Sequence, residues 1–132
     1  MRIRLPRFQF GLRTFLLAIA IVAIGLWWYL MWSRYQLAKE EFERSLAAWD
    51  AGSATWMSIL EASEKLCDAE DALPFVSRAH AMRGHLVRVL KFENRWLSWW
   101  DSYEGSPESF HERAKAIRDY REAQENALRK LE

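Results

Sequence analysis

The chain has 132 residues, of which 51% are hydrophobic, and it carries 19 Lys and Arg against 18 Asp and Glu. This balance lacks the strongly basic footprint of a nucleic-acid binder, and the single cysteine, Cys67, excludes an intramolecular disulfide and a Cys-based zinc site. Because Gly and Pro are few and strand-like alternation is absent, we expect an all-α protein in which one small domain accompanies a membrane anchor.

Residues 1–13 form a short basic lead. They hold four Arg and no acidic residue, whereas all 18 acidic residues follow residue 33, where 15 Lys and Arg leave a formal charge of −3. Basic residues stay on the cytoplasmic side of a membrane span, so we expect a cytoplasmic lead and a C-terminal domain, residues 34–132, on the other side. In a bacterium this predicts an inner-membrane protein with a periplasmic domain.

Residues 14–33 are predicted to form one transmembrane helix. Eighteen consecutive residues, from Phe15 to Trp32, carry no charge and no Pro. A helix of this length measures about 27 Å, close to the roughly 30 Å of a hydrocarbon core. Aromatic rings crowd its outer end, where the headgroup layer favours them. The residues expected to mark the span are Phe15, Leu16, Ile19, Ile24, Trp27, Trp28 and Trp32.

Two other interpretations of this apolar run are a cleaved signal peptide and a buried core helix. A signal peptide has a shorter apolar region, about 7–15 residues, and ends in small residues before its cleavage site. This run is longer and closes on the bulky sequence Trp-Trp-Tyr-Leu-Met-Trp. A buried core helix needs other segments on all sides, and the rest of this chain is too short to surround it. We therefore expect a retained anchor.

The outer domain is predicted to contain about four antiparallel helices. Apolar residues at spacings of three and four follow the span without a breaker, which predicts that the membrane helix continues outward as a single rod of about 35 residues. Gly52 is the first stop signal, and Ser53 or Thr55 can cap a second helix. Pro74 is expected to end that second helix.

The second half of the outer domain is predicted to be another helical hairpin. Pro74 is tolerated in a first helical turn, and an apolar stripe then runs from Phe75 to Trp100. Glu93 interrupts this stripe, which leaves open whether the third helix is continuous or bends. After a polar turn, Pro107 is expected to open the last helix.

No side-chain constellation in the sequence predicts catalysis or ligand binding. His80 and His85 are five residues apart, so on a helix they diverge by roughly 140° and cannot share a metal. His111 stands alone, and the acidic clusters lack the apolar cleft that would separate their pKa values. Cys67 falls on the apolar side of its helix, where packing is its simplest role. We expect a non-enzymatic protein without metal, cofactor or small-molecule substrate.

Five of the eight Trp are predicted to gather at the end of the outer domain that is farthest from the membrane. In one interpretation their rings only plug the end of a thin bundle. In the other, Trp99 and also Trp56 stay exposed and form a docking hot spot, a setting in which Trp is over-represented. These five residues, the tip tryptophans, are Trp49, Trp56, Trp96, Trp99 and Trp100.

The segment from Trp49 to Leu73 resembles the tip and returning helix of outer-membrane efflux proteins, the TolC-like family. The matching aromatic, Gly, Leu and Ala positions are Trp49, Gly52, Leu60, Ala62, Leu66, Ala69 and Leu73. A looser likeness covers residues 35–132, and the family carries its hairpin twice per chain. Tyr103 stands where the glycine would recur, and the family's barrel strands have no counterpart. The resemblance therefore implies helical hairpins, with a turn at Gly52, and not export through an outer-membrane channel.

These features together predict a non-enzymatic, single-pass, membrane-anchored helical scaffold or interaction protein of the bacterial cell envelope. Its expected partners are the lipid bilayer and either another protein or a second copy of itself. The alternative is an accessory subunit of an efflux or secretion complex that docks through its hairpin tip.

Overall fold

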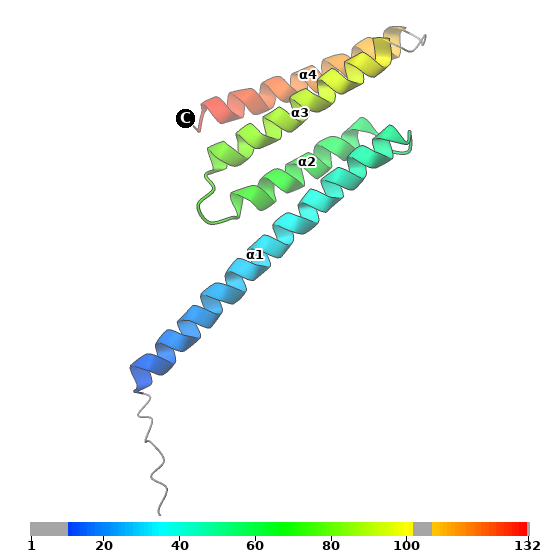
Figure 1. The fold of residues 1–132 in the computed structure, drawn as a ribbon. Coiled ribbons are helices and arrows are strands. Elements are labelled where there is room, and N and C mark those ends of the chain that lie inside the picture. The colour runs from blue at the N-terminus through cyan, green and yellow to red at the C-terminus, as the bar shows by residue number, and fades with distance from the viewer. Residues whose placement is uncertain (1–10, 102–106, 132) are drawn as a thin grey trace, which may run out of the picture.

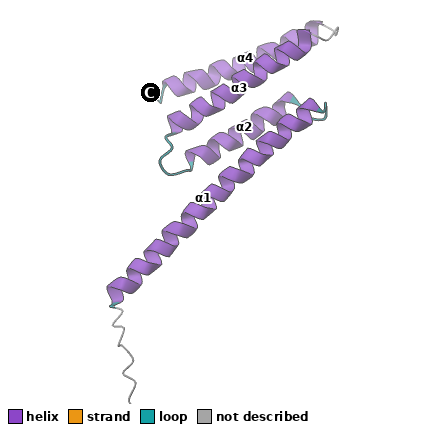
Figure 2. Cartoon of the chain, viewed as in Figure 1, coloured by secondary structure: helices purple, strands orange, loops and turns teal. Residues whose placement is uncertain are grey.

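The computed structural model of the protein describes residues 11–101 and 107–131, and every regular element in these ranges is a helix. The helices are α1 (Leu12–Asp50), α2 (Trp56–Asp71), α3 (Arg78–Asp101) and α4 (Pro107–Arg129). Figure 1 shows the first half of α1 standing clear of the other helices, and Figure 2 shows the short turns that join α1 to α2 and α2 to α3. The predicted fold, a long apolar N-terminal helix followed by helices that pack together, is confirmed.

α1 is a single helix of 39 residues, about 58 Å long at ~1.5 Å per residue. After Arg13 its first half carries no charge and no Pro, so nothing in the sequence breaks it before Gly52. Every side chain from Leu12 to Leu30 is exposed, and partial burial begins at Met31. α1 therefore has an unpacked apolar first half and an outer half that belongs to the bundle.

The turn between α1 and α2 depends on Gly52, whose φ of 72° lies in the left-handed region that side chains disfavour. The Gly52 amide donates to the carbonyl of Trp49 at 2.8 Å, and the Ser53 amide donates to the carbonyl of Ala48 at 2.9 Å. These bonds satisfy carbonyl groups at the end of α1. Thr55 then caps α2, because its side-chain oxygen accepts a backbone N–H of the first turn. The predicted hairpin turn and one of its two predicted caps are present.

The loop between α2 and α3 corrects the sequence prediction. Pro74 was expected in the first turn of the third helix and Phe75 on its apolar face, but both lie in a loop and α3 begins at Arg78. Phe75 has a φ of 74°, a left-handed conformation that no α-helix contains. Ser77 caps α3 instead, since its hydroxyl oxygen accepts the amide N–H of His80 at 3.2 Å.

α3 is continuous through Glu93, the residue at which a bend was considered. Glu93 is only 7% exposed, and Arg121 of α4 donates from Nη1 to its Oε2 at 2.9 Å. The ion pair allows a carboxylate to occupy the buried face without breaking the helix. Pro107 begins α4 as predicted, at a position where its missing N–H leaves no bond unmade.

The helices pack in chain order, with α2 against α1, α3 against α2 and α4 against α3. The hydrophobic core lies in the half of the bundle next to the α1–α2 turn, which we call the distal end, and all four helices contribute to it. Its buried members are Ile59, Phe92, Trp96 and Ile117, and Phe42, Leu46, Trp49, Trp56 and Ala114 pack around them. Toward the α2–α3 loop the interior also holds buried polar residues, Ser63 and His85, among apolar ones such as Leu66, Ala81 and Leu86.

Candidate functional site

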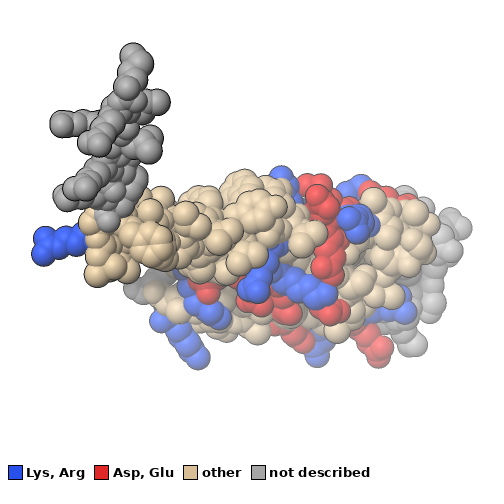
Figure 3. All heavy atoms as spheres, turned by 90° about the horizontal axis from the view of Figure 1, so that it is seen from below, with Lys and Arg blue, Asp and Glu red and all other residues tan. Residues whose placement is uncertain are grey.

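The first half of α1, which is apolar after Arg13, projects from the other described helices as a largely uncharged surface (Figure 3). The seven residues expected to mark the span are between 44% and 64% exposed. Within the described residues, α1 is the helix long and apolar enough to span a membrane by length and composition. An apolar surface of this extent favours a lipid environment, in which a helix satisfies its own backbone groups.

The structure brings three of the tip tryptophans together at the distal end. Trp49 and Trp56 flank the α1–α2 turn and pack against the core cluster, to which α3 contributes Trp96. Trp96 is only 3% exposed, so a partner at this end would contact Trp49 or Trp56 before it. Trp49 meets the ring of Phe92 edge-on, with 5.3 Å between ring centroids. These three rings therefore pack the end of the bundle.

A hollow of about 480 Å³ opens beside these rings. It is lined by Trp49, Asp50, Gly52, Ala54, Arg95 and Ser98. Arg95 of α3 donates to Asp50 of α1 at 2.8 Å, and this ion pair joins the two hairpins. The side chains of the remaining tip tryptophans, Trp99 and Trp100, lie outside the described part of the structure.

A chain of side-chain hydrogen bonds crosses the polar half of the bundle. Nε of Arg88 donates to Oγ of Ser63 at 3.2 Å, and the Ser63 hydroxyl lies 2.8 Å from Nδ1 of His85. Nε2 of His85 lies 2.9 Å from Oη of Tyr120, and that hydroxyl donates to the Glu64 carboxylate. With the His85 proton on Nε2, every donor in the chain faces an acceptor. The chain links α2, α3 and α4.

This hydrogen-bond pattern requires a neutral His85. Burial lowers the pKa of His85, and the nearby positive charge of Arg88 lowers it further. A Ser–His pair at this distance has the geometry of a nucleophile and its base. Ser63 and His85 are each only 1% exposed, however, so no substrate can reach the Ser63 oxygen. The pair holds helices together.

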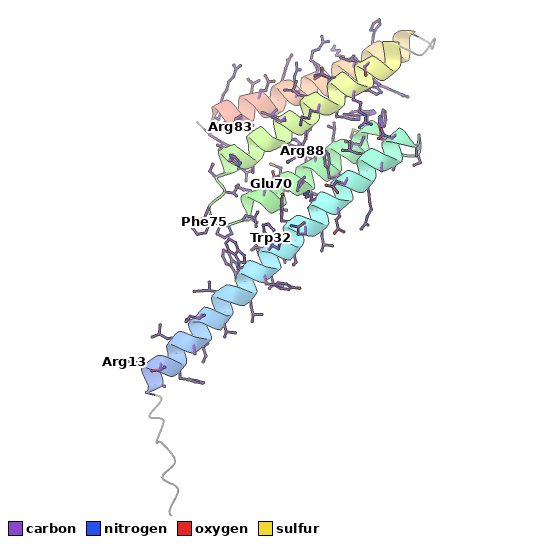
Figure 4. The ribbon with its side chains drawn as sticks, in the orientation of Figure 1. Arg13, Trp32, Glu70, Phe75, Arg83 and Arg88 are labelled. Carbon is purple, nitrogen blue, oxygen red and sulfur yellow. The ribbon has the colours of Figure 1, made fainter. Side chains whose placement is uncertain are left out.

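Arg88 also forms a largely enclosed ion pair between α3 and α2. Its guanidinium bonds both oxygens of Glu70, at 2.9 and 3.0 Å, and the two side chains are 16% and 20% exposed. The same group lies 5.9 Å from the ring centroid of Phe42 on α1. A Cβ at Gly84 would lie 3.4 Å from both Arg88 and Glu70, so a residue without a side chain leaves room for the pair. Figure 4 shows Arg88 and Glu70 facing one another between α3 and α2.

Sequence reasoning missed this polar interior. The signal that could have found it is a polar residue inside an apolar stripe, as at Ser63 on α2 and His85 on α3. Their partner Tyr120 is 35 residues from His85 and on another helix, so the pairing depends on how the helices are aligned. The apolar periodicity of a single helix does not predict how that helix is aligned with its neighbours.

Comparison of the chain with models of protein families, with curated protein sequences and with solved structures finds no match. The TolC-like resemblance of the Trp49–Leu73 segment therefore stays a prediction.

Proposed function

We propose that this is a non-enzymatic, single-pass membrane protein that holds a helical bundle at the outer face of the bacterial inner membrane as a scaffold for protein contacts. The observation that carries the proposal is the division of α1 into an uncovered apolar half and a half that packs into the bundle. A helix continuous between the two fixes the bundle to the membrane. The buried positions of Ser63 and His85 support a role without catalysis.

The proposed orientation has the N-terminus in the cytoplasm and the bundle in the periplasm. The basic lead before the span and the aromatic residues at its far end support it. Alkaline phosphatase fused after Glu132 is expected to be active, and green fluorescent protein at the same place is expected to be dark. Fusions made directly after Arg13 serve as the matched control and should show the reverse pattern. A dark phosphatase and a bright fluorescent protein after Glu132 would overturn the orientation.

The second candidate is an accessory subunit of an efflux or secretion complex that docks through the distal end. The open hollow beside Trp49, whose lining includes the charged pair Arg95 and Asp50, favours this end as a contact surface. A photo-crosslinking amino acid at exposed Ser53, in the turn, should capture a channel or pump subunit in cells. The same amino acid at exposed Ala123 on α4 should not. Equal capture at both positions, or capture of this chain alone, would remove the accessory hypothesis and leave the scaffold.

A further inference from the structure

The loop between α2 and α3 is apolar and carries one fully exposed aromatic ring, which is unusual for a surface loop. Four consecutive apolar residues, Leu73 to Val76, occupy it, and Phe75 is 98% exposed. Phe75 is also the one non-glycine residue with positive φ, 74°, among those the structure describes. A bulky side chain in that conformation is a costly outlier, and such outliers concentrate at functional sites.

The loop lies beside the part of α1 expected to cross the membrane. The Phe75 ring centroid is 6.2 Å from that of Trp28. Trp28 precedes Trp32, the expected outer end of the span, by four residues, or about 6 Å along the helix axis. Packing of the bundle against α1 begins at Met31. Phe75 therefore lies roughly one helical turn closer to the N-terminal end of α1 than the start of this packing. Figure 4 shows it at the lower edge of the bundle, beside α1.

The neighbours of Phe75 hold the loop in this position. Leu73 and Val76 are half-buried and line a hollow of about 240 Å³ together with Trp32 and Tyr35 of α1. Leu73 and Val76 thus lie beside α1, whereas the Phe75 side chain stays exposed next to the ring of Trp28. Packing within the chain does not explain a fully exposed ring held in a strained backbone.

We propose that the α2–α3 loop is a second membrane contact, in which Phe75 inserts beside Trp28 into the outer leaflet near the glycerol level of the lipids. The inference rests on the proposed anchor, because the position of α1 sets the membrane level. Apolar groups of interfacial segments reach about 5–10 Å into the boundary between headgroups and acyl chains, which matches the depth of Trp28. The loop and α1 then contact the membrane at two points, which restricts rotation of the bundle about the axis of α1.

The test measures the depth of position 75 in the full-length protein. The cysteine-free variant Cys67→Ser in phosphatidylcholine–phosphatidylglycerol nanodiscs receives a nitroxide label at Phe75→Cys. Collision with oxygen, which concentrates in lipid, is compared with collision with a water-soluble nickel complex. Labels at Ile21→Cys, within the span, and at Ser53→Cys, at the distal end, give the lipid and water references.

The expected result is an oxygen-to-nickel ratio at position 75 several-fold above that at position 53. A ratio at position 75 equal to that at position 53, with position 21 in lipid, would overturn the loop contact and leave the anchor intact. A water-like ratio at position 21 would overturn the anchor itself, and the loop contact with it.

A second set of variants keeps Phe75 in place, so that the label does not replace the side chain under test. A label at exposed Ala72→Cys reports on the same loop. Adding Phe75→Asp should raise the nickel accessibility of position 72 several-fold, whereas Phe75→Leu should leave it unchanged. Equal accessibility in both variants would contradict insertion of the ring.

Discussion

At the scale of single residues, matched hydrogen-bond donors and acceptors join the helices in the half of the bundle next to the α2–α3 loop. Ser63, His85 and Tyr120 form one connected series in which the Ser63 hydroxyl donates to Nδ1 of His85 and Nε2 of His85 donates to the Tyr120 hydroxyl. A buried polar series of this kind stabilises the fold only while all of its members stay satisfied. Substituting one member should therefore cost more than one hydrogen bond, and the effect should depend on pH.

Replacing His85 by Gln tests the neutral histidine. Burial lowers the pKa of His85 in the folded protein. The contribution of neutral His85 to the free energy of unfolding is therefore fully present above the ordinary histidine pKa of about 6.5. It is lost as the pH falls below that value, by up to ~1.4 kcal/mol per pH unit. The wild type should exceed His85→Gln in free energy of unfolding at neutral pH, by roughly 1–3 kcal/mol, and the gap should narrow toward pH 5. Urea titrations followed by circular dichroism measure it. Exposed His80→Gln is the control, and a gap that does not change with pH would contradict the neutral state.

Replacing Arg88 by Met tests the enclosed ion pair. Glu70 would lose its partner in a site that is 20% exposed, so the free energy of unfolding should fall by roughly 3 kcal/mol. Glu70→Gln added to Arg88→Met should recover part of the loss, because no unpaired charge remains. The matched control is Arg44→Met, whose pair with Glu40 is 79% and 58% exposed and should change stability by under ~0.5 kcal/mol. A loss equal to the control's would show that the Arg88 pair contributes nothing.

At the scale of elements, helix ends marked by residues with special backbone properties could be predicted from the sequence. Gly52 and Pro107 signal a helix end and a helix start by local chemistry alone, and the structure has both. The start of α3 was missed because no local rule places Phe75 at positive φ. The loop that contains Phe75 lies beside α1, where Leu73 and Val76 line a hollow with Trp32 and Tyr35, and this tertiary placement cannot be derived from local sequence rules. The polar series was missed for the same kind of reason, since its members come from different helices.

Replacing Gly52 by Ala isolates the cost of the α1–α2 turn. No atom lies within 4 Å of the position that an added Cβ would take, so the penalty comes only from the left-handed backbone and should be about 1 kcal/mol. Gly52→Asn should cost less, because Asn tolerates this conformation. Gly25→Ala, in the middle of α1 and equally free of contacts, is the control and should leave the unfolding midpoint of the bundle unchanged. An unchanged midpoint for Gly52→Ala would mean that the turn does not need its glycine.

At the scale of the whole molecule, the outer half of α1 is part of the bundle as well as its support. Phe42, Leu46 and Trp49 cover the core residues of α2 and α3. Residues 34–132 expressed without the span should therefore be strongly helical by circular dichroism, with a spectrum unchanged by chelator or reductant. Residues 51–132 should lose most of that signal, because the core is left uncovered on one side. Equal helicity of the two fragments would show that α1 is dispensable for folding.

Because α1 is one continuous helix, a tilt of its apolar first half would also tilt the bundle. No Gly or Pro lies between Leu26 and Asp50, so an uninterrupted helix joins the outer part of the proposed membrane segment to the bundle. About 27 Å of helix separates Trp32 from Asp50, and a tilt of ~20°, ordinary for a membrane helix, moves the distal end sideways by roughly 9 Å. Changes in bilayer thickness alter helix tilt. On the proposed membrane anchor, they would therefore displace a partner that is bound at the distal end.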